Sequence, residues 1–285
     1  METAKASLPG RPATPPVPEE GSIDLWLTPV PAALGTGVAH ALAAVLSADE
    51  RERMARFRFE EDRVRYLCAH ASLRELLSGY RPDVAPGDWR FSADRFGKPG
   101  LVGAPVPLDF NLSHTDGLVA IAVTGGTAVG VDVERRRAAH DDELLFEACL
   151  AESEAAPLRR LRAGERGDRF HVLWTLKEAY LKACGVGLSR DLRGVELRLG
   201  PDGVLLEVRD AAGVDARWRF GQATLEDGAV ALAVAMACPA VSPEASSGSA
   251  PSTVAVRTRE RAVDGTVRAS RPALDLRDVR VYGAR

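Results

Sequence analysis

Two carboxylates, Asp132 and Glu134, stand one residue apart in the otherwise apolar stretch GVDVE, residues 130–134. Alternate residues of a strand face the same side, so both carboxylates point together while Val131 and Val133 point the other way. Two neighbouring like charges repel and raise at least one pKa unless a cation lies between them. Mg²⁺ prefers carboxylate and phosphate oxygens, so the pair is a candidate metal site. The alternative is a solvated strand end in which Glu134 pairs with a nearby arginine.

A second stretch, WTLKEAYLK at residues 174–182, places Glu178 and Lys182 four residues apart, on one face of a predicted helix. An ordinary helix ion pair worth about 0.3–0.5 kcal/mol is one interpretation. The other is a third carboxylate and a lysine that join the first motif in a metal and phosphate site. Most basic residues are arginine, which suggests that the few positions occupied by lysine have a chemical role. The lysines are Lys5, Lys98, Lys177 and Lys182.

Composition narrows the class of protein. The 285 residues are 46% hydrophobic and 27% charged with a net charge of −3, which is ordinary for a globular protein and gives no support for nucleic-acid binding. No apolar run approaches the roughly 20 residues of a membrane span. The cysteines are scattered without a CxxC pair, so neither zinc nor a disulfide framework is expected, and a cytoplasmic location fits best; they are Cys68, Cys149, Cys184 and Cys238.

The order of predicted elements repeats: a strand, helices, then antiparallel strands. In the first half we expect strands at 22–30 and within 107–126, and helices at 38–47 and 48–78. In the second half we expect a strand at 127–134, helices at 142–150, 152–162 and 167–183, and strands at 194–200, 203–210, 216–225 and 229–237. This order predicts an α+β pseudo-dimer of two similar halves, with a ligand in the cleft between them.

The predicted boundaries follow composition. Residues 1–21 form a Pro-rich leader that we expect to be disordered and not a signal peptide, and residues 240–285 form a Ser/Pro-rich tail that reads as linker or disorder. Within that tail, the alternating stretch 273–285 is expected to pair as a short strand. The halves span 22–126 and 127–239.

These motifs resemble those of the 4′-phosphopantetheinyl transferases, specifically the surfactin-synthetase-activating (Sfp) type. GVDVE followed about 40 residues later by WTLKEAYLK matches the family pattern, and FNLSHTDG at 110–117 and RFGKPGL at 95–101 agree with it. The similarity covers residues 23–237. It implies a pseudo-dimeric fold in a monomeric chain. It also implies transfer of the phosphopantetheine arm of coenzyme A to a serine of an apo carrier protein, with release of adenosine 3′,5′-bisphosphate.

The resemblance also assigns roles at the two motifs. Asp132, Glu134 and Glu178 would hold Mg²⁺, or Mn²⁺ in its place, against the pyrophosphate. Glu178 would be the general base that takes the serine proton, and Lys182 would contact the phosphate at the cleaved bond. Val133 cannot reach the metal, so water should fill that coordination position. Such chemistry needs positioning and charge neutralisation more than covalent help from the protein.

Contacts with coenzyme A are implied by the other two stretches. Ser113 and His114 match a phosphate-contacting pair, and Gly97, Lys98 and Pro99 match a loop beside the adenine.

One helix matches the family's site for the 3′-phosphate of coenzyme A. Arg53 falls at a position that binds this phosphate, and Arg65 falls near the adenine. Glu50 departs from the pattern, because relatives often have a basic residue there, and Arg51 is the neighbour that could compensate.

As partners we expect acyl or peptidyl carrier domains of peptide or polyketide synthases, no nucleic acid and no membrane. A docking face rich in arginine is expected to meet the acidic carrier, and its candidates are Arg56, Arg58, Arg135, Arg136 and Arg137. The residue usage is typical of a GC-rich bacterial genome, such as one that directs secondary metabolism.

Two other classes of protein compete with the transferase. One is a Mg²⁺-dependent phosphoesterase that uses the same carboxylates to activate water. The other is a non-catalytic binding module, against which the intact residues of both motifs argue.

Overall fold

The first half of the chain forms one sheet covered by helices. A computed structural model describes residues 15–103, 107–136, 143–187, 190–203, 205–212, 216–238, 256–261, 267–269 and 277–283. The elements of this half are β1 (Ile23–Pro29), α1 (Thr36–Ala44), α2 (Ala48–Ala55), α3 (Glu60–Tyr80), β2 (Phe91–Ala93), β3 (Pro99–Leu101), β4 (Asp109–Thr115) and β5 (Leu118–Thr124). β5 pairs antiparallel with β1 and with β4, and β2 and β3 form a separate hairpin.

The second half repeats this plan with a larger sheet, whose strand order is β6-β10-β9-β13-β8-β7 and in which β13 (Arg277–Gly283) comes from the C-terminal tail. Its elements are β6 (Val129–Arg135), α4 (Glu143–Cys149), α5 (Glu152–Leu158), α6 (Ala163–Cys184), β7 (Val195–Leu199), β8 (Leu205–Asp210), β9 (Ala216–Leu225) and β10 (Val230–Ala237). The predicted α+β architecture of two sheet-containing halves is therefore confirmed.

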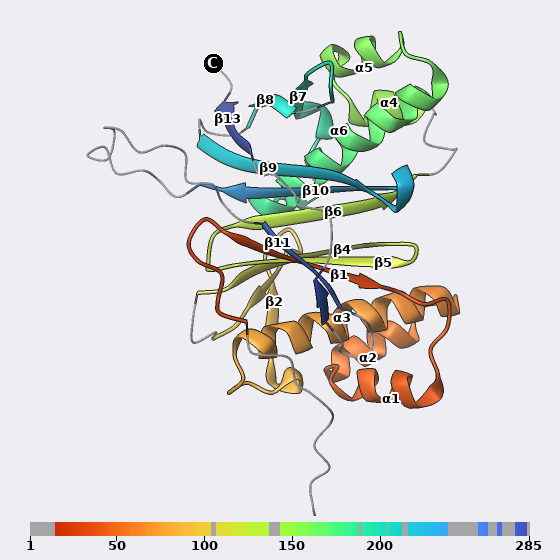
Figure 1. Ribbon diagram of the computed structural model, residues 1–285, viewed down its shortest axis with the longest axis vertical. Helices are drawn as coiled ribbons and strands as arrows, with labels where there is room; N and C mark the ends of the chain where they lie inside the picture. Colours follow the sequence, from red (N-terminus) through yellow and green to blue (C-terminus); the bar gives the residue numbers. More distant parts are fainter. Residues whose placement is uncertain are drawn as a thin grey trace, which may run out of the picture.

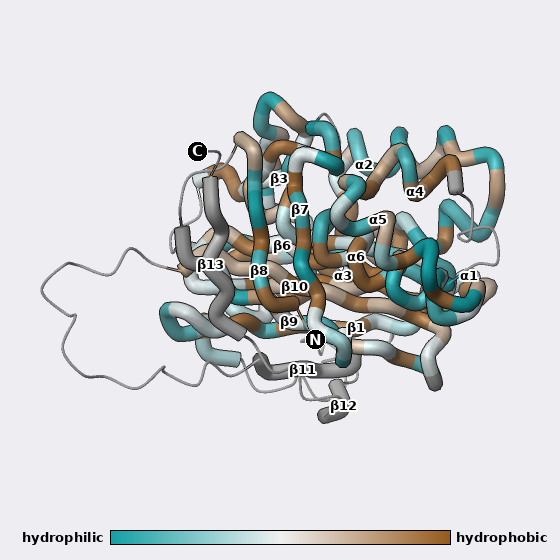
Figure 2. The backbone as a smooth tube through the Cα atoms, turned by 90° about the horizontal axis from the view of Figure 1, so that it is seen from above, coloured by the Kyte–Doolittle hydropathy of each residue, from teal (hydrophilic) through white to brown (hydrophobic). Residues whose placement is uncertain are grey.

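The two sheets stack face to face, with the helices on the outside (Figure 1). Between the sheets lies an apolar core contributed by β1, β5, β6 and β10, including Leu25, Val131 and Leu232. A second core joins the other face of β1, β4 and β5 to α3, and a third joins β10 to α6. Residues of β5 and β10 therefore alternate between two apolar environments, which explains why these strands read as nearly continuous hydrophobic runs. Figure 2 shows this concentration of hydrophobic residues along β6 and β10, in contrast with the hydrophilic α2.

The single helix expected at 48–78 is wrong, because α2 ends at Ala55 and α3 begins at Glu60. The side chain of Ser47 accepts a hydrogen bond from the Glu50 N–H and the Glu50 carboxylate accepts one from the Ser47 N–H, which fixes the start of α2. Three acidic residues in the first turn of α3 favour a new helix N-terminus there. Helical spacing of apolar residues persists across the break, so periodicity alone could not reveal it.

Both flanks differ in part from the predicted disorder. The tail contributes β11 (Val256–Arg261), which pairs in parallel with β1, and β12 (Val267–Ala269), which pairs with β11. The expected terminal strand is confirmed by β13 (Arg277–Gly283), which lies between β8 and β9. An edge strand offers unpaired backbone groups, and β1 gains its second neighbour in this way. In the leader, Val17 packs against the core around α3; residues 1–14, 239–255, 262–266 and 270–276 lie outside the described residues.

Candidate active site

β6 packs tightly against α6 at Gly130. A Cβ at this position would clash with the carbonyl oxygen of Ala179 and lie 2.5 Å from the nitrogen of Ala183. Gly130 therefore lets the backbones of strand and helix touch. Asp132 lies on the same strand face as Gly130, and Lys182 follows Glu178 by one helical turn, so this contact brings both motifs together.

Lys182 bridges the motifs. Its Nζ donates to Oδ1 of Asp132 at 2.6 Å and to Oγ of Ser113 on β4 at 3.1 Å, and the Ser113 hydroxyl donates to the same Oδ1 at 2.9 Å. The side chain of Asp132 is 3% exposed and that of Lys182 is 26% exposed. A nearly buried carboxylate thus has a cation that can still reach solvent, which is what a phosphate-binding lysine at the edge of a metal site requires.

Glu178 is buried beside this pair. Burial raises the pKa of its carboxyl to about 7, and the negative charge of Asp132 adds to the rise while Lys182 opposes it. Oε1 of Glu178 and Oδ2 of Asp132 are buried and have no hydrogen-bond partner among the described residues. Two carboxylate oxygens left without partners are the donors that a hard divalent cation selects, so these residues fit Mg²⁺.

Glu134 lies apart from this buried pair, at the half-buried end of β6. It lines a hollow of about 240 Å³ together with Phe57, Asp62, Arg65, Tyr66, His114 and Thr115. Within the described part of the chain, no three His, Cys, Asp or Glu side chains are grouped so that they could hold a metal ion. The geometry therefore brings Asp132 and Glu178 together and leaves Glu134 on the neighbouring hollow.

Ser113 and His114 do not share a face of β4. Ser113 is buried against Asp132, whereas His114 lines the hollow with Glu134, and only part of its side chain reaches solvent. Loss of hydration lowers the pKa of His114, and the positive charges of Arg65 and Lys182 lower it further. The lowered pKa favours the neutral imidazole of His114 over the protonated form. The Ser113 hydroxyl is already engaged by the buried pair.

Two arginines predicted to bind coenzyme A differ in their surroundings. Arg53 is exposed on α2. Arg65 on α3 lies in the hollow, and its guanidinium bonds Asp62 and Asp116, the latter in the turn between β4 and β5. Arg65 therefore has two anionic partners, with which any ligand anion would compete.

The β2–β3 hairpin contacts the C-terminal end of α6. Lys98 donates to the carbonyls of Val129 and Ala183 at 3.3 and 3.4 Å and to Oδ2 of Asp109 at 3.4 Å. Gly97 adopts φ +89° in the hairpin turn, directly before Lys98 and Pro99. A cation at a helix C-terminus is stabilising, so Lys98 has a structural role in addition to any contact with a ligand.

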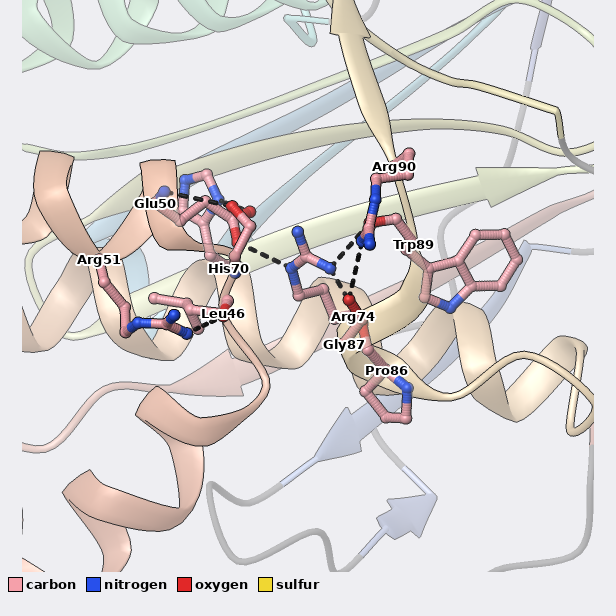
Figure 3. A network of polar contacts seen from close by, with 10 residues as sticks. Leu46, Glu50, Arg51, His70, Arg74, Pro86, Gly87, Trp89 and Arg90 are labelled. Atoms are coloured by element: carbon pink, nitrogen blue, oxygen red, sulfur yellow. Dashed lines mark hydrogen bonds and ion pairs between the residues drawn. The ribbon is translucent and has the colours of Figure 1, made fainter.

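Glu50, the departure from the family pattern, belongs to a buried network (Figure 3). Its carboxylate accepts hydrogen bonds from Nε of Arg74 at 2.8 Å and lies 3.1 Å from Nδ1 of His70. Arg74 also donates to the carbonyls of Pro86 and Trp89. Burial alone would raise the pKa of Glu50, but the hydrogen bonds from His70, the Ser47 N–H and Arg74 outweigh it and lower the pKa to about 2. Arg51, the suggested substitute, donates to the carbonyl of Leu46 instead.

Lys177 is a buried structural lysine. Its Nζ donates to Glu154 at 2.6 Å and to the carbonyls of Cys149 and Leu192 at 3.0 and 3.1 Å. Glu154 also accepts the N–H of Leu197 at 2.8 Å, so this pair joins α6 to α5 and β7. No local sequence pattern singles out Glu154, because its partner Lys177 lies 23 residues away.

Most arginines proposed for carrier docking have partners within the chain. Arg135 bonds Glu226, Arg136 bonds Asp168 and Arg56 pairs with Glu52. Arg58 lies over the exposed ring of Phe59, 5.5 Å from its centroid. Arg137 lies outside the described residues. Across the part of the chain that the structure describes, no helix is long and apolar enough to cross a membrane.

Comparison with known proteins agrees with this geometry. Residues 128–235 match the 4′-phosphopantetheinyl transferase superfamily, and residues 37–125 match the N-terminal region of a 4′-phosphopantetheinyl transferase. The chain is 40% identical over 162 residues to 4′-phosphopantetheinyl transferase HetI of Nostoc sp., covering 56% of this chain and 68% of HetI. It is 31% identical over 168 residues to 4′-phosphopantetheinyl transferase Sfp of Bacillus subtilis, covering 58% of this chain and 72% of Sfp.

The chain belongs to the 4′-phosphopantetheinyl transferase family. It is a transferase, and enzymes of this family move phosphopantetheine from coenzyme A to carrier proteins. Neither the family matches nor these relatives support the phosphoesterase alternative.

Proposed function

We propose that this enzyme is an Sfp-type transferase that modifies apo acyl or peptidyl carrier domains of peptide or polyketide synthases. The arrangement of Asp132, Lys182 and Ser113, beside two unpartnered carboxylate oxygens, is the observation on which the proposal rests. The proposed coenzyme A half spans residues 22–126 and the catalytic half spans 127–239. We further propose that the chain acts as a cytoplasmic monomer, because one chain already contains both halves.

Asp132 and Glu178 would hold Mg²⁺, or Mn²⁺ in its place, and Glu134 would complete the set from the neighbouring hollow. When bound, the cation would neutralise the pyrophosphate charge. Lys182 is placed to exchange Asp132 for the phosphate at the cleaved bond, because its Nζ is partly exposed. Phosphoryl transfer depends mainly on such positioning and countercharge.

Glu178 is proposed as the general base. Burial raises the pKa of Glu178 to about 7 in the metal-free protein, and a bound cation would lower it, so the carboxylate would be ionised and able to accept a proton in the loaded site. The serine hydroxyl of the carrier transfers its proton to this carboxylate, directly or through one water. The serine oxygen then forms a bond to the β-phosphorus of coenzyme A, and adenosine 3′,5′-bisphosphate leaves.

Coenzyme A is proposed to lie along the hollow between α3, β4 and β6. His114, Arg65 and Arg53 would contact its phosphates and adenine from one side. Lys98, with Gly97 and Pro99, would flank it from the hairpin. Ser113 would act on the phosphates through Lys182, because its hydroxyl already contacts Lys182 and Asp132.

Release of adenosine 3′,5′-bisphosphate tests the reaction class. The protein is incubated with coenzyme A and Mg²⁺, with an apo carrier, without it, and with a carrier whose modified serine is replaced by alanine. The proposal predicts release only with the intact carrier. Release at the same rate in all three reactions would show hydrolysis and contradict transfer. Several apo peptidyl and acyl carriers, compared by kcat/KM, identify the preferred partner.

A further inference from the structure

β6 is supported on its two edges in different ways. On one edge its backbone pairs antiparallel with β10, from Val129 to Arg135. On the other edge its backbone N–H groups donate to side chains of β4. The acceptors are Asp109 Oδ2 for Val129 at 3.3 Å, Asn111 Oδ1 for Val131 at 2.9 Å, Ser113 Oγ for Val133 at 3.4 Å and Thr115 Oγ1 for Arg135 at 2.9 Å.

These contacts form a ladder with a constant step. Each acceptor on β4 lies 20 residues before its donor on β6, and both sets advance by two residues. The two strands therefore run in the same direction, and side chains replace the backbone carbonyls of a normal neighbour. Asn111 and Thr115 are 5% and 6% exposed, so each supplies a buried N–H with an acceptor that water does not replace.

The ladder fixes the residues on either side of the carboxylates. Asp132 lies between Val131 and Val133, whose N–H groups are held by Asn111 and Ser113. A strand that shifts by one residue turns all its side chains to the opposite face, so register decides whether Asp132 faces α6 at all. Ser113 also contacts the carboxylate itself, whereas among the described residues Asn111 and Thr115 accept hydrogen bonds from the backbone of β6 and from no other group.

We propose that Asn111 and Thr115 are positioning residues that set the register of β6, and thereby the geometry of Asp132 and Glu134 toward a divalent cation. This inference rests on the proposed function, because it assumes that these carboxylates bind the metal. Removal of a group that does not touch the metal but holds its ligands in place changes metal affinity or activity about 10–100-fold.

Two pairs of variants separate the hydrogen bond from the shape of the side chain. Thr115→Val removes the acceptor and keeps the shape, and Thr115→Ser keeps the hydroxyl. Asn111→Leu removes the acceptor, and Asn111→Asp keeps an acceptor oxygen. The control is Thr124→Val, since Thr124 on β5 is 1% exposed and its hydroxyl donates to the carbonyl of Thr127, away from the ladder.

Mn²⁺ binding to the full chain, with and without coenzyme A, is measured by electron paramagnetic resonance, alongside kcat and the KM for coenzyme A. We expect Thr115→Val and Asn111→Leu to weaken Mn²⁺ binding and to lower kcat by about tenfold or more. Asn111 does not line the hollow proposed for coenzyme A, so Asn111→Leu should change the KM for coenzyme A less than twofold. Thr115→Ser should restore both values, and Thr124→Val should lower only the melting temperature.

Three outcomes would overturn the inference. One is a folded Thr115→Val whose Mn²⁺ affinity and kcat equal those of the unmodified protein. Another is a loss in Thr115→Ser as large as that in Thr115→Val. The third is unmodified protein that modifies no carrier and binds no Mn²⁺, which would remove the proposed function as well. If Asn111→Leu does not fold, the Thr115 pair alone decides.

Discussion

The ammonium group of Lys182 lies 2.6 Å from Oδ1 of Asp132, across the contact between α6 and β6. A cation from one motif therefore neutralises a buried carboxylate of the other. In the proposed reaction the metal would neutralise Asp132 in place of Lys182, and the phosphate would pair with Lys182 in place of Asp132. This relationship makes Lys182 important both to the metal-free protein and to catalysis.

We expect Lys182→Met to lower kcat for carrier modification by about 10²–10³-fold, the loss typical of removing one group that stabilises developing charge. In the absence of metal, the free energy of unfolding of Lys182→Met should be about 2 kcal/mol lower than that of the unmodified protein, because Asp132 keeps a buried charge without its partner. Urea unfolding with and without Mg²⁺ checks this, and Mg²⁺ should restore part of the loss. An unchanged kcat would show that Lys182 does not act on the phosphate.

Gly130→Ala tests the contact between strand and helix. The added methyl group meets the backbone of Ala179 and Ala183, which cannot rotate away, so α6 must shift. We expect a loss of about 1–3 kcal/mol in the free energy of unfolding and a larger effect on kcat than on the KM for coenzyme A. The matched control is Gly167→Ala on α6, where a Cβ meets nothing within 4 Å; it should gain up to about 1 kcal/mol. Equal behaviour of the two variants would contradict this account.

The pKa of Glu178 predicts a pH dependence of stability in metal-free protein. Its folded pKa, about 7, is raised above the ordinary glutamate value of 4.5, so folding favours the protonated form. The stabilisation is complete below pH 4.5 and is lost as the pH rises through 7, to a total of about 3 kcal/mol. Glu178→Gln should remove this dependence and be more stable than the unmodified protein at pH 8. If the free energy of unfolding changed equally between pH 5 and pH 8 in Glu178→Gln and in the unmodified protein, the prediction would be contradicted.

Glu50 predicts the opposite dependence. Its pKa, about 2, is lowered from 4.5, so its stabilisation is present above pH 4.5 and is lost as the pH falls toward 2. Glu50→Gln retains a side chain that can cap α2 and loses the charge that faces Arg74 and His70. We expect a loss of about 3 kcal/mol at pH 7 and almost none at pH 2, measured by denaturant unfolding. A family-like Glu50→Lys should destabilise the protein and should not tighten coenzyme A binding.

Local periodicity accounts for what the sequence predicted well. Strand alternation places Asp132 and Glu134 on one face of β6, and helical spacing places Glu178 and Lys182 on one side of α6. The order of elements likewise predicted two sheet-containing halves. These features depend on residues close together in the chain.

Features that depend on distant residues could not be predicted in this way. The Ser113 hydroxyl looked available for phosphate until Asp132 and Lys182 were found to engage it. Glu50 looked like a defect in a binding site, yet His70 and Arg74, 20 and 24 residues away, explain its charge. Asn111 lies within the FNLSHTDG stretch, but its role cannot be predicted from the sequence, because its partner Val131 is on another strand, 20 residues away.

The most direct test of the central claim is the intact mass of an apo carrier protein after incubation with this enzyme, coenzyme A and Mg²⁺. The account predicts a gain of one phosphopantetheine group with the unmodified enzyme and no detectable gain with Glu178→Gln or after chelation of the metal. Full modification of the carrier by folded Glu178→Gln would contradict it. So would the absence of modification by the unmodified enzyme when a control transferase modifies the same carrier.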